Sequence, residues 1–123
     1  MTDSAFFDTN IIVYLFDQSN PLKRKESARL FDYYFKAKRG YLSTQVLSEF
    51  FVVTTKKLKL LAEKDAQQLV NDFLKTNLII IDDHVMSTAM KIATSHHLSF
   101  WDALIVTAAL QGHAAKGLEV GKM

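Results

Sequence analysis

Short apolar runs alternate along this chain with longer segments in which apolar residues recur at helical spacing. Runs such as Ala5-Phe6-Phe7 are typical of buried strands, whereas apolar residues every three or four positions are typical of helices packed on one face. Strands are predicted at residues 5–7, 41–43 and 78–81. Helices are predicted at residues 11–16, 21–37, 45–51, 61–75 and 84–95, with a last one in segment 98–113. This alternation predicts an α/β layered sandwich built on a parallel sheet.

Polar residues stand where several of the predicted helices begin. Asn10, Thr44, Asp82 and Ser99 each precede a helical segment and suit the N-cap position. Gly40 follows the second helix and is typical of a residue that ends one. Three of the four helix starts come directly after a predicted strand. In a parallel sheet such junctions share one edge, where ligands bind.

Composition limits the kind of protein. With 123 residues, 49% hydrophobic and 23% charged, the chain predicts one folded domain over residues 1–123. It contains no cysteine, which excludes disulfides and thiolate metal sites and leaves oxygen or histidine ligands for any metal. The N-terminus has no basic or cleavable signal, and no apolar run approaches the ~20 residues of a membrane span. We expect a soluble, non-exported protein of the cytoplasm.

Positive charge is concentrated in the middle of the chain. The formal net charge is only +2, but residues 20–64 contain eleven Lys and Arg residues against four acids. The basic residues are Lys23, Arg24, Lys25, Arg29, Lys36, Lys38, Arg39, Lys56, Lys57, Lys59 and Lys64. Solvated helix faces explain such a segment most simply, and a surface that binds a polyanion is the alternative.

Three acids stand inside or beside apolar stretches, which most acids avoid: Asp8, Glu49 and Asp102. Each has a local explanation. Asp8 suits a turn between strand and helix, Glu49 suits the wet face of a helix, and Asp102 lies three residues after Ser99, as in a capping box. All three nevertheless lie at or near strand-to-helix junctions, so we expect them to meet at one edge of the sheet.

Three carboxylates gathered at one edge would repel one another unless a cation lay between them. A cluster of oxygen ligands with open positions suits Mg²⁺ or Mn²⁺. Such an ion activates water and stabilises the charge that develops when a phosphodiester is cleaved. The basic middle segment would then hold a nucleic-acid backbone.

The blocks "FFDTNIIVYLFD", "LSTQVLSEFF" and "SFWDALIVTAAL" resemble, in order and spacing, the signature blocks of the PIN-domain family, especially the VapC-like toxins of bacterial toxin–antitoxin pairs. The resemblance covers about residues 5–113. It implies a three-layer α/β/α sandwich with a short parallel sheet, and a metal-dependent endoribonuclease that acts on single-stranded or structured RNA.

The resemblance also implies roles for individual residues and partners. Asp8, Glu49 and Asp102 would be the catalytic ligands of Mg²⁺ or Mn²⁺. Thr9 would orient the site, and Asn10 would hold a structural position around it. Family members are usually homodimers, and the toxins are inhibited by an antitoxin that inserts a segment near the acidic pocket.

The C-terminal end departs from the family pattern. A short strand and a fourth acidic residue would be expected after the third block, but the chain continues "QGHAAKGLEVGKM", whose one acid is Glu119. We do not assign the fourth acidic role to Glu119. The ending is compatible with a sheet that lacks its C-terminal strand and a site that lacks one ligand. The alternative function is therefore a catalytically impaired PIN-like module that binds RNA or protein.

The remaining candidates concern substrate contact. The basic residues chosen as RNA contacts are Lys23, Arg24, Lys25, Lys56 and Lys57. Trp101 could stack on a base, as aromatic side chains do in single-strand binding. Its place on the helix face of Leu104, Ile105 and Ala108 favours core packing instead.

A third reading is phosphoryl transfer through an aspartyl intermediate, since Asp8 ends a strand. The haloacid-dehalogenase pattern requires a second Asp at position 10, where this chain has Asn10, and a receiver-type domain would need an acidic pair near the first strand. This reading is therefore disfavoured.

Overall fold

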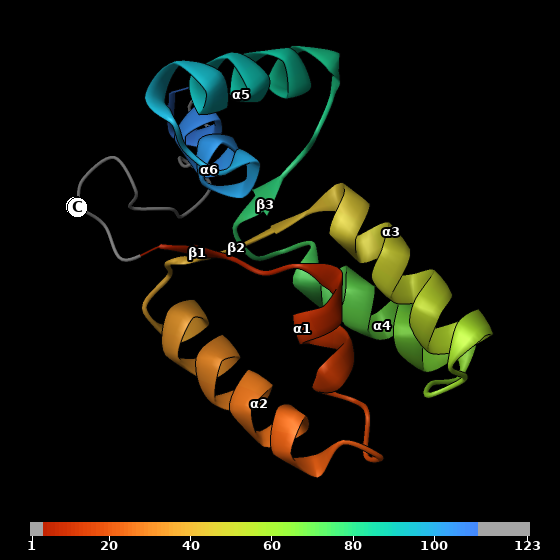
Figure 1. The fold of residues 1–123 in the computed structure, drawn as a ribbon. Coiled ribbons are helices and arrows are strands. Elements are labelled where there is room, and N and C mark those ends of the chain that lie inside the picture. Colours follow the sequence, from red (N-terminus) through yellow and green to blue (C-terminus); the bar gives the residue numbers. More distant parts are fainter. Residues whose placement is uncertain (1–3, 111–123) are drawn as a thin grey trace.

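The computed structural model describes residues 4–110. Its elements are β1 (Ala5–Phe6), α1 (Thr9–Tyr14), α2 (Pro21–Lys36), β2 (Gly40–Ser43), α3 (Thr44–Val52), η1 (Val53–Lys57), α4 (Glu63–Phe73), β3 (Leu78–Ile79), α5 (Asp83–His96) and α6 (Phe100–Leu110). The three strands form a parallel sheet in the order β1-β2-β3, which confirms the predicted α/β class (Figure 1). Two expectations, the missing C-terminal strand and Glu119, lie outside the described residues.

Helices cover both faces of this short sheet. Figure 1 shows α5 and α6 on one side and α1 to α4 on the other. Each side has its own apolar core. Tyr41 of β2 packs with residues of α5 and α6, whereas its neighbour Leu42 packs with residues of α1, α3 and α4. Successive strand residues point to opposite faces, so this one strand contributes to both layers. The result is the expected three-layer arrangement.

The strand register brings two helix starts to one edge of the sheet. In β1 and β2 the paired residues are Ala5 with Gly40 and Phe6 with Tyr41. β1 therefore ends just before Asp8, and β2 runs directly into α3. Since both strands point the same way, the first turns of α1 and α3 lie side by side at the carboxyl edge, and these two helices pack together.

Two of the predicted helix caps are wrong by one or two positions. Asp8, not Asn10, caps α1: its backbone is extended and its Oδ1 accepts a 3.2 Å hydrogen bond from the amide of Ile11. Ser43, not Thr44, caps α3. A cap must have extended dihedrals and lie just outside the helix. Asp8 and Ser43 meet this condition because each ends the extended segment of its strand.

Gly40 has a different role from the predicted one. Helix α2 ends at Lys36 with Ala37 as its C-cap. Lys38 follows with a positive φ of 59°, and Gly40 is already the first residue of β2. A Cβ atom at position 40 would lie 2.4 Å from a ring carbon of Phe35. Glycine is therefore required here for close packing of strand against helix.

Strand β3 is shorter than the predicted segment 78–81. Its last residue, Ile79, pairs with Ser43, where β2 ends. Among residues 4–110, Ile80 therefore has no strand beside it, and it is 48% exposed. Among the described residues, no helix is long and apolar enough to cross a membrane.

Candidate active site

A cavity of about 310 Å³ opens at the carboxyl edge of the sheet. It is lined by Asp8, Thr9, Asn10, Gln45, Val46, Glu49 and Trp101. These residues come from three places in the chain: the start of α1, the first two turns of α3 and the first turn of α6. The strand register explains the arrangement for α1 and α3. The fold thus brings together the three sequence blocks that carry the predicted site.

Two of the three predicted acids line this cavity, and Thr9 connects them. The Thr9 hydroxyl donates a 2.6 Å hydrogen bond to Oε1 of Glu49, across 40 residues of sequence. Thr9 follows Asp8 directly, while the Oδ1 atom of Asp8 accepts the capping bond from Ile11. Each carboxylate is therefore held by one oxygen. Its second oxygen accepts no hydrogen bond from residues 4–110.

The donor set suits a hard divalent cation. Asp8 and Glu49 supply carboxylate oxygens, and Asn10 and Gln45 supply amide oxygens on the same cavity. Mg²⁺ and Mn²⁺ bind oxygen ligands of this kind. Within the described part of the chain, neither Asp8 nor Glu49 forms an ion pair with a Lys or Arg side chain. The negative charge at the cavity is therefore available to a cation, and the residues fit a metal ion.

Asp102 is placed beside this cavity rather than on its wall. It lies in the first turn of α6, next to Trp101, and its amide donates a 3.0 Å hydrogen bond to Oγ of the N-cap Ser99. A carboxylate is favoured at this end of a helix by the exposed amides. In residues 4–110 no three His, Cys, Asp or Glu side chains lie close enough together to hold a metal ion. The expected gathering of three acids is therefore seen for two of them, and the metal role of Asp102 stays a prediction.

The prediction that Trp101 packs in the core is wrong. Its side chain is 45% exposed and lines the acidic cavity. The ring stacks on Phe6, with centroids 5.1 Å apart and planes 16° apart. The helix face was assigned correctly, because Leu104 and Ala108 are buried. The first turn of α6, however, lies at the end of β1, where the core stops.

The helix that carries Glu49 changes geometry after α3. Segment η1 is a π-helix, in which the amide of Leu58 bonds to the carbonyl of Val53, five residues earlier, at 2.9 Å. The hydroxyls of Thr54 and Thr55 each donate to the carbonyl four residues earlier, at 2.7 and 2.6 Å, the second of these being that of Phe51. Hydroxyls bonded in this way bend helices. Thr54 and Thr55 thus favour the change from α-helix to π-helix at this point.

This π-turn decides where Lys57 points. Continued α-helix would place residue 57 about 80° around the axis from Glu49, since each residue turns by about 100°. A π-helix has more residues per turn, so Lys57 returns to the Glu49 face. Both residues line a second cavity of about 430 Å³, which shares Thr9 and Asn10 with the first. The two adjoining cavities together form an acidic groove, and a basic side chain lies at the end formed by the second cavity.

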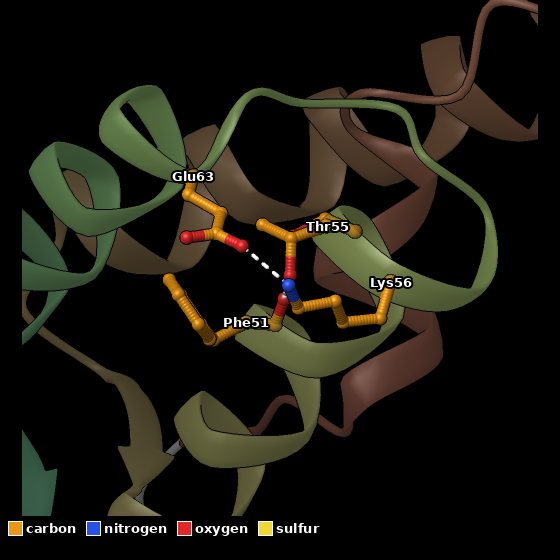
Figure 2. Close-up of polar contacts among 5 residues, drawn as sticks. Phe51, Thr55, Lys56 and Glu63 are labelled. Carbon is orange, nitrogen blue, oxygen red and sulfur yellow. Dashed lines mark hydrogen bonds and ion pairs between the residues drawn. The ribbon is translucent and has the colours of Figure 1, made fainter.

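Lys56, one residue earlier, points elsewhere. Figure 2 shows its ammonium group paired with the carboxylate of Glu63 at the start of α4. This cation also lowers the pKa of Glu63, through its hydrogen bond and its charge. The two neighbouring lysines thus have different environments, which the sequence alone did not distinguish.

The other three predicted RNA contacts lie away from the cavity walls. Lys23, Arg24 and Lys25 are exposed in the first turns of α2. The ammonium of Lys23 lies 3.3 Å from the hydroxyl of Tyr14 and 5.0 Å from the centre of its ring. Their contact with RNA stays a prediction.

Sequence reasoning did not name Gln45 of the cavity, and it considered Trp101 as a base-stacking residue but favoured core packing. Gln45 lies four positions before Glu49, so both fall on one face of α3. That spacing is a signal the sequence did contain. For Trp101 the sequence contained no signal that decides between stacking and core packing, because an aromatic residue on an apolar helix face looks the same whether the core extends beneath it or ends there.

Comparison with known families identifies the family of this chain. A family model described as PIN domain matches residues 5–116. No curated protein and no solved structure shows significant similarity to the chain. PIN domains are generally metal-dependent nucleases, and the family implies an RNA substrate. Since the match spans most of the sequence and includes all three acidic blocks, this chain belongs to the PIN-domain family.

Proposed function

We propose that this protein is a metal-dependent endoribonuclease that cleaves RNA phosphodiester bonds. The observation that carries the proposal is the cavity at the sheet edge, where Asp8 and Glu49 lie together without a Lys or Arg partner among residues 4–110. The Thr9 hydroxyl holds Glu49 in place. Uncompensated carboxylates that face one cavity are suited to binding a divalent cation and, through it, a phosphate.

Each residue has a distinct task in this proposal. Asp8 and Glu49 hold Mg²⁺ or Mn²⁺, and Asp102 contributes a third carboxylate from the first turn of α6. The bound ion supplies activation of water and neutralisation of the charge that develops on the phosphate. Thr9 fixes the Glu49 carboxylate by its hydrogen bond, and Asn10 borders the same cavity. Lys57 holds the RNA backbone at the end of the groove.

We further propose that the protein acts as the toxin of a toxin–antitoxin pair, as a homodimer with an antitoxin partner. This finer assignment rests on the resemblance of the three sequence blocks to VapC-like toxins. Growth arrest upon expression, relieved by the Asp8→Asn substitution, is the expected result. Arrest that persists in the Asp8→Asn variant would contradict the toxin assignment.

The direct test is RNA cleavage by the Asp8→Asn variant in the presence of Mg²⁺ or Mn²⁺. Asn and Asp are equally good N-caps, so the substitution removes a charge while the start of α1 is preserved. We expect cleavage to fall by at least about 100-fold, since even outer partners of a metal ligand contribute 10- to 100-fold. Asp65→Asn, in the exposed first turn of α4, is the matched control and should cleave normally.

Two results would contradict the proposal. Cleavage that survives both Asp8→Asn and chelation of divalent ions would show that this site does not carry the reaction. Absence of cleavage and of metal binding by calorimetry, with RNA still retained, would favour the alternative of a catalytically impaired module that binds RNA or protein.

A further inference from the structure

Trp101 is set apart from the other exposed apolar residues by its position at the acidic cavity. Its ring is 45% exposed although it lies in an apolar segment, and it forms part of the wall that Asp8 and Glu49 also line. Trp101 is also the one tryptophan of the chain. A single exposed aromatic residue needs no explanation by itself, but an aromatic ring on the wall of a polar cavity can serve as a stacking surface.

Two neighbouring rings hold Trp101 in a fixed orientation. Phe6 of β1 stacks on it at 5.1 Å and 16°, and Phe100 meets it edge-on at 5.4 Å and 72°. Phe6 is anchored in the sheet, where it pairs with Tyr41. The ring of Trp101 is therefore supported from behind, while its remaining surface faces the cavity. A rigid aromatic surface of this kind binds a flat partner with little loss of conformational freedom.

The polar side chains beside Trp101 indicate which flat molecule would bind to its ring. The carboxylates of Asp8 and Glu49 suit a phosphate held through a cation, as proposed above, and Gln45 offers both a donor and an acceptor on the same wall. A nucleotide combines a phosphate, polar base edges and a flat ring. A cavity of about 310 Å³ is at the small end of ligand pockets, ~300–1,000 Å³, which suits one unstacked nucleotide.

We propose that Trp101 is a positioning residue that stacks on an unpaired nucleobase beside the cleaved phosphate. The proposal rests on the function proposed above and adds to it the residue that orients the RNA chain in the cavity. Base-paired RNA buries its bases in the helix, so a duplex cannot offer a base face to Trp101. Stacking on an aromatic ring is tolerant of base identity, so we expect a requirement for unpaired RNA rather than for one sequence.

The test uses the fluorescence of Trp101, which is unambiguous because no other tryptophan is present. In the Asp8→Asn background, where cleavage is blocked, a short single-stranded RNA should quench this fluorescence. The same RNA annealed to its complement, and inorganic polyphosphate, should not. An RNA that lacks the base at the stacked position should bind without quenching. Intact single-stranded RNA that binds, as measured by the anisotropy of a labelled strand, without quenching Trp101 would overturn the proposal, as would absence of binding by that RNA.

Substitutions separate stacking from folding. Trp101→Leu should weaken single-strand binding about 5- to 150-fold, the effect of one base–aromatic stack, and Trp101→Phe should restore most of it. Val106→Ala is the matched control, because Val106 is another exposed apolar residue of α6 that does not line the cavity. Equal binding by Trp101→Leu and the wild type would refute the stack.

The two proposals fail in different ways. Metal-dependent cleavage that is unaffected by Trp101→Leu would retain the nuclease and reject the stack. Quenching by single-stranded RNA without any metal-dependent cleavage in the wild type would retain the stack and reject the nuclease.

Discussion

Replacing Lys57 with Gln tests whether the π-helix η1 positions a cation for the RNA backbone. Lys57 lines the groove that also contains Glu49, whereas Lys56 is paired with Glu63 on α4. The two lysines are adjacent in sequence and have the same charge. A comparison of Lys57→Gln with Lys56→Gln therefore separates the effect of where the lysine side chain lies from the effect of removing one positive charge.

The expected effect of Lys57→Gln on the salt dependence of RNA binding follows from counterion release. Each phosphate of a single strand that a cation neutralises contributes about 0.7 to the slope of log affinity against log salt concentration. If Lys57 contacts one phosphate, Lys57→Gln should lower that slope by about 0.7. Lys56→Gln should change the slope much less, because its ammonium group is already engaged by Glu63.

The assay is the anisotropy of a labelled single-stranded RNA, measured over a series of salt concentrations in the Asp8→Asn background. Thermal unfolding of each variant provides the control for folding. Equal slopes for the two lysine variants would refute the reasoning, as would a larger loss for Lys56→Gln. Either result would mean that the π-helix after α3 does not give Lys57 a contact with the RNA backbone that Lys56 lacks.

The Lys56 variant also has a pH signature. Since Lys56 lowers the pKa of Glu63 in the folded state, this pair stabilises the protein above the ordinary value of 4.5, and the contribution is lost as the pH falls through the lowered pKa. The stability difference between wild type and Lys56→Gln should therefore disappear in acid. A difference that persists there would have another origin.

Two further predictions concern the scaffold. Gly40→Ala should destabilise the fold by ~1–3 kcal/mol in denaturant unfolding, because its Cβ would lie 2.4 Å from the Phe35 ring. Adding Phe35→Leu to the same chain should recover part of the lost stability. Losses that simply add in the double variant would show that the two side chains do not clash. Tyr41→Phe should not lower stability at neutral pH, because the buried Tyr41 hydroxyl has no hydrogen-bond partner among residues 4–110. Burial raises the pKa of Tyr41 to about 12, above its unfolded value of 10.0, so the stability of the wild type should fall as the pH rises from 10 to 12. The Tyr41→Phe variant should lose less stability over this range when unfolding is followed by circular dichroism. Equal losses in the two proteins would contradict this prediction.

Much of the fold was predictable because its signals are local. The apolar run at residues 5–7 and the helical spacing after Pro21 depend only on near neighbours in the chain, and the structure contains the corresponding elements. Element ends were less predictable. Ser43 rather than Thr44 caps α3, and β3 stops at Ile79, because the extent of a strand depends on the strand beside it.

The candidate site likewise has features that the sequence predicts and features that depend on distant contacts. The sequence by itself determined which chemistry is present: acids in apolar surroundings, oxygen ligands without cysteine, and a basic middle segment. It also determined the order of the three blocks, since each block places an acid at or near the start of a helix. These are properties of residue type and spacing, which need no knowledge of distant contacts.

Only the tertiary structure decided which of these groups meet. The parallel register of β1 and β2 places Thr9 within hydrogen-bonding distance of Glu49, 40 residues later. The end of β1 leaves Trp101 exposed at the cavity, and the π-turn separates Lys57 from Lys56. Each of these outcomes depends on where a neighbouring element ends or how a helix is wound, and such long-range geometry is not encoded in any single segment of the chain.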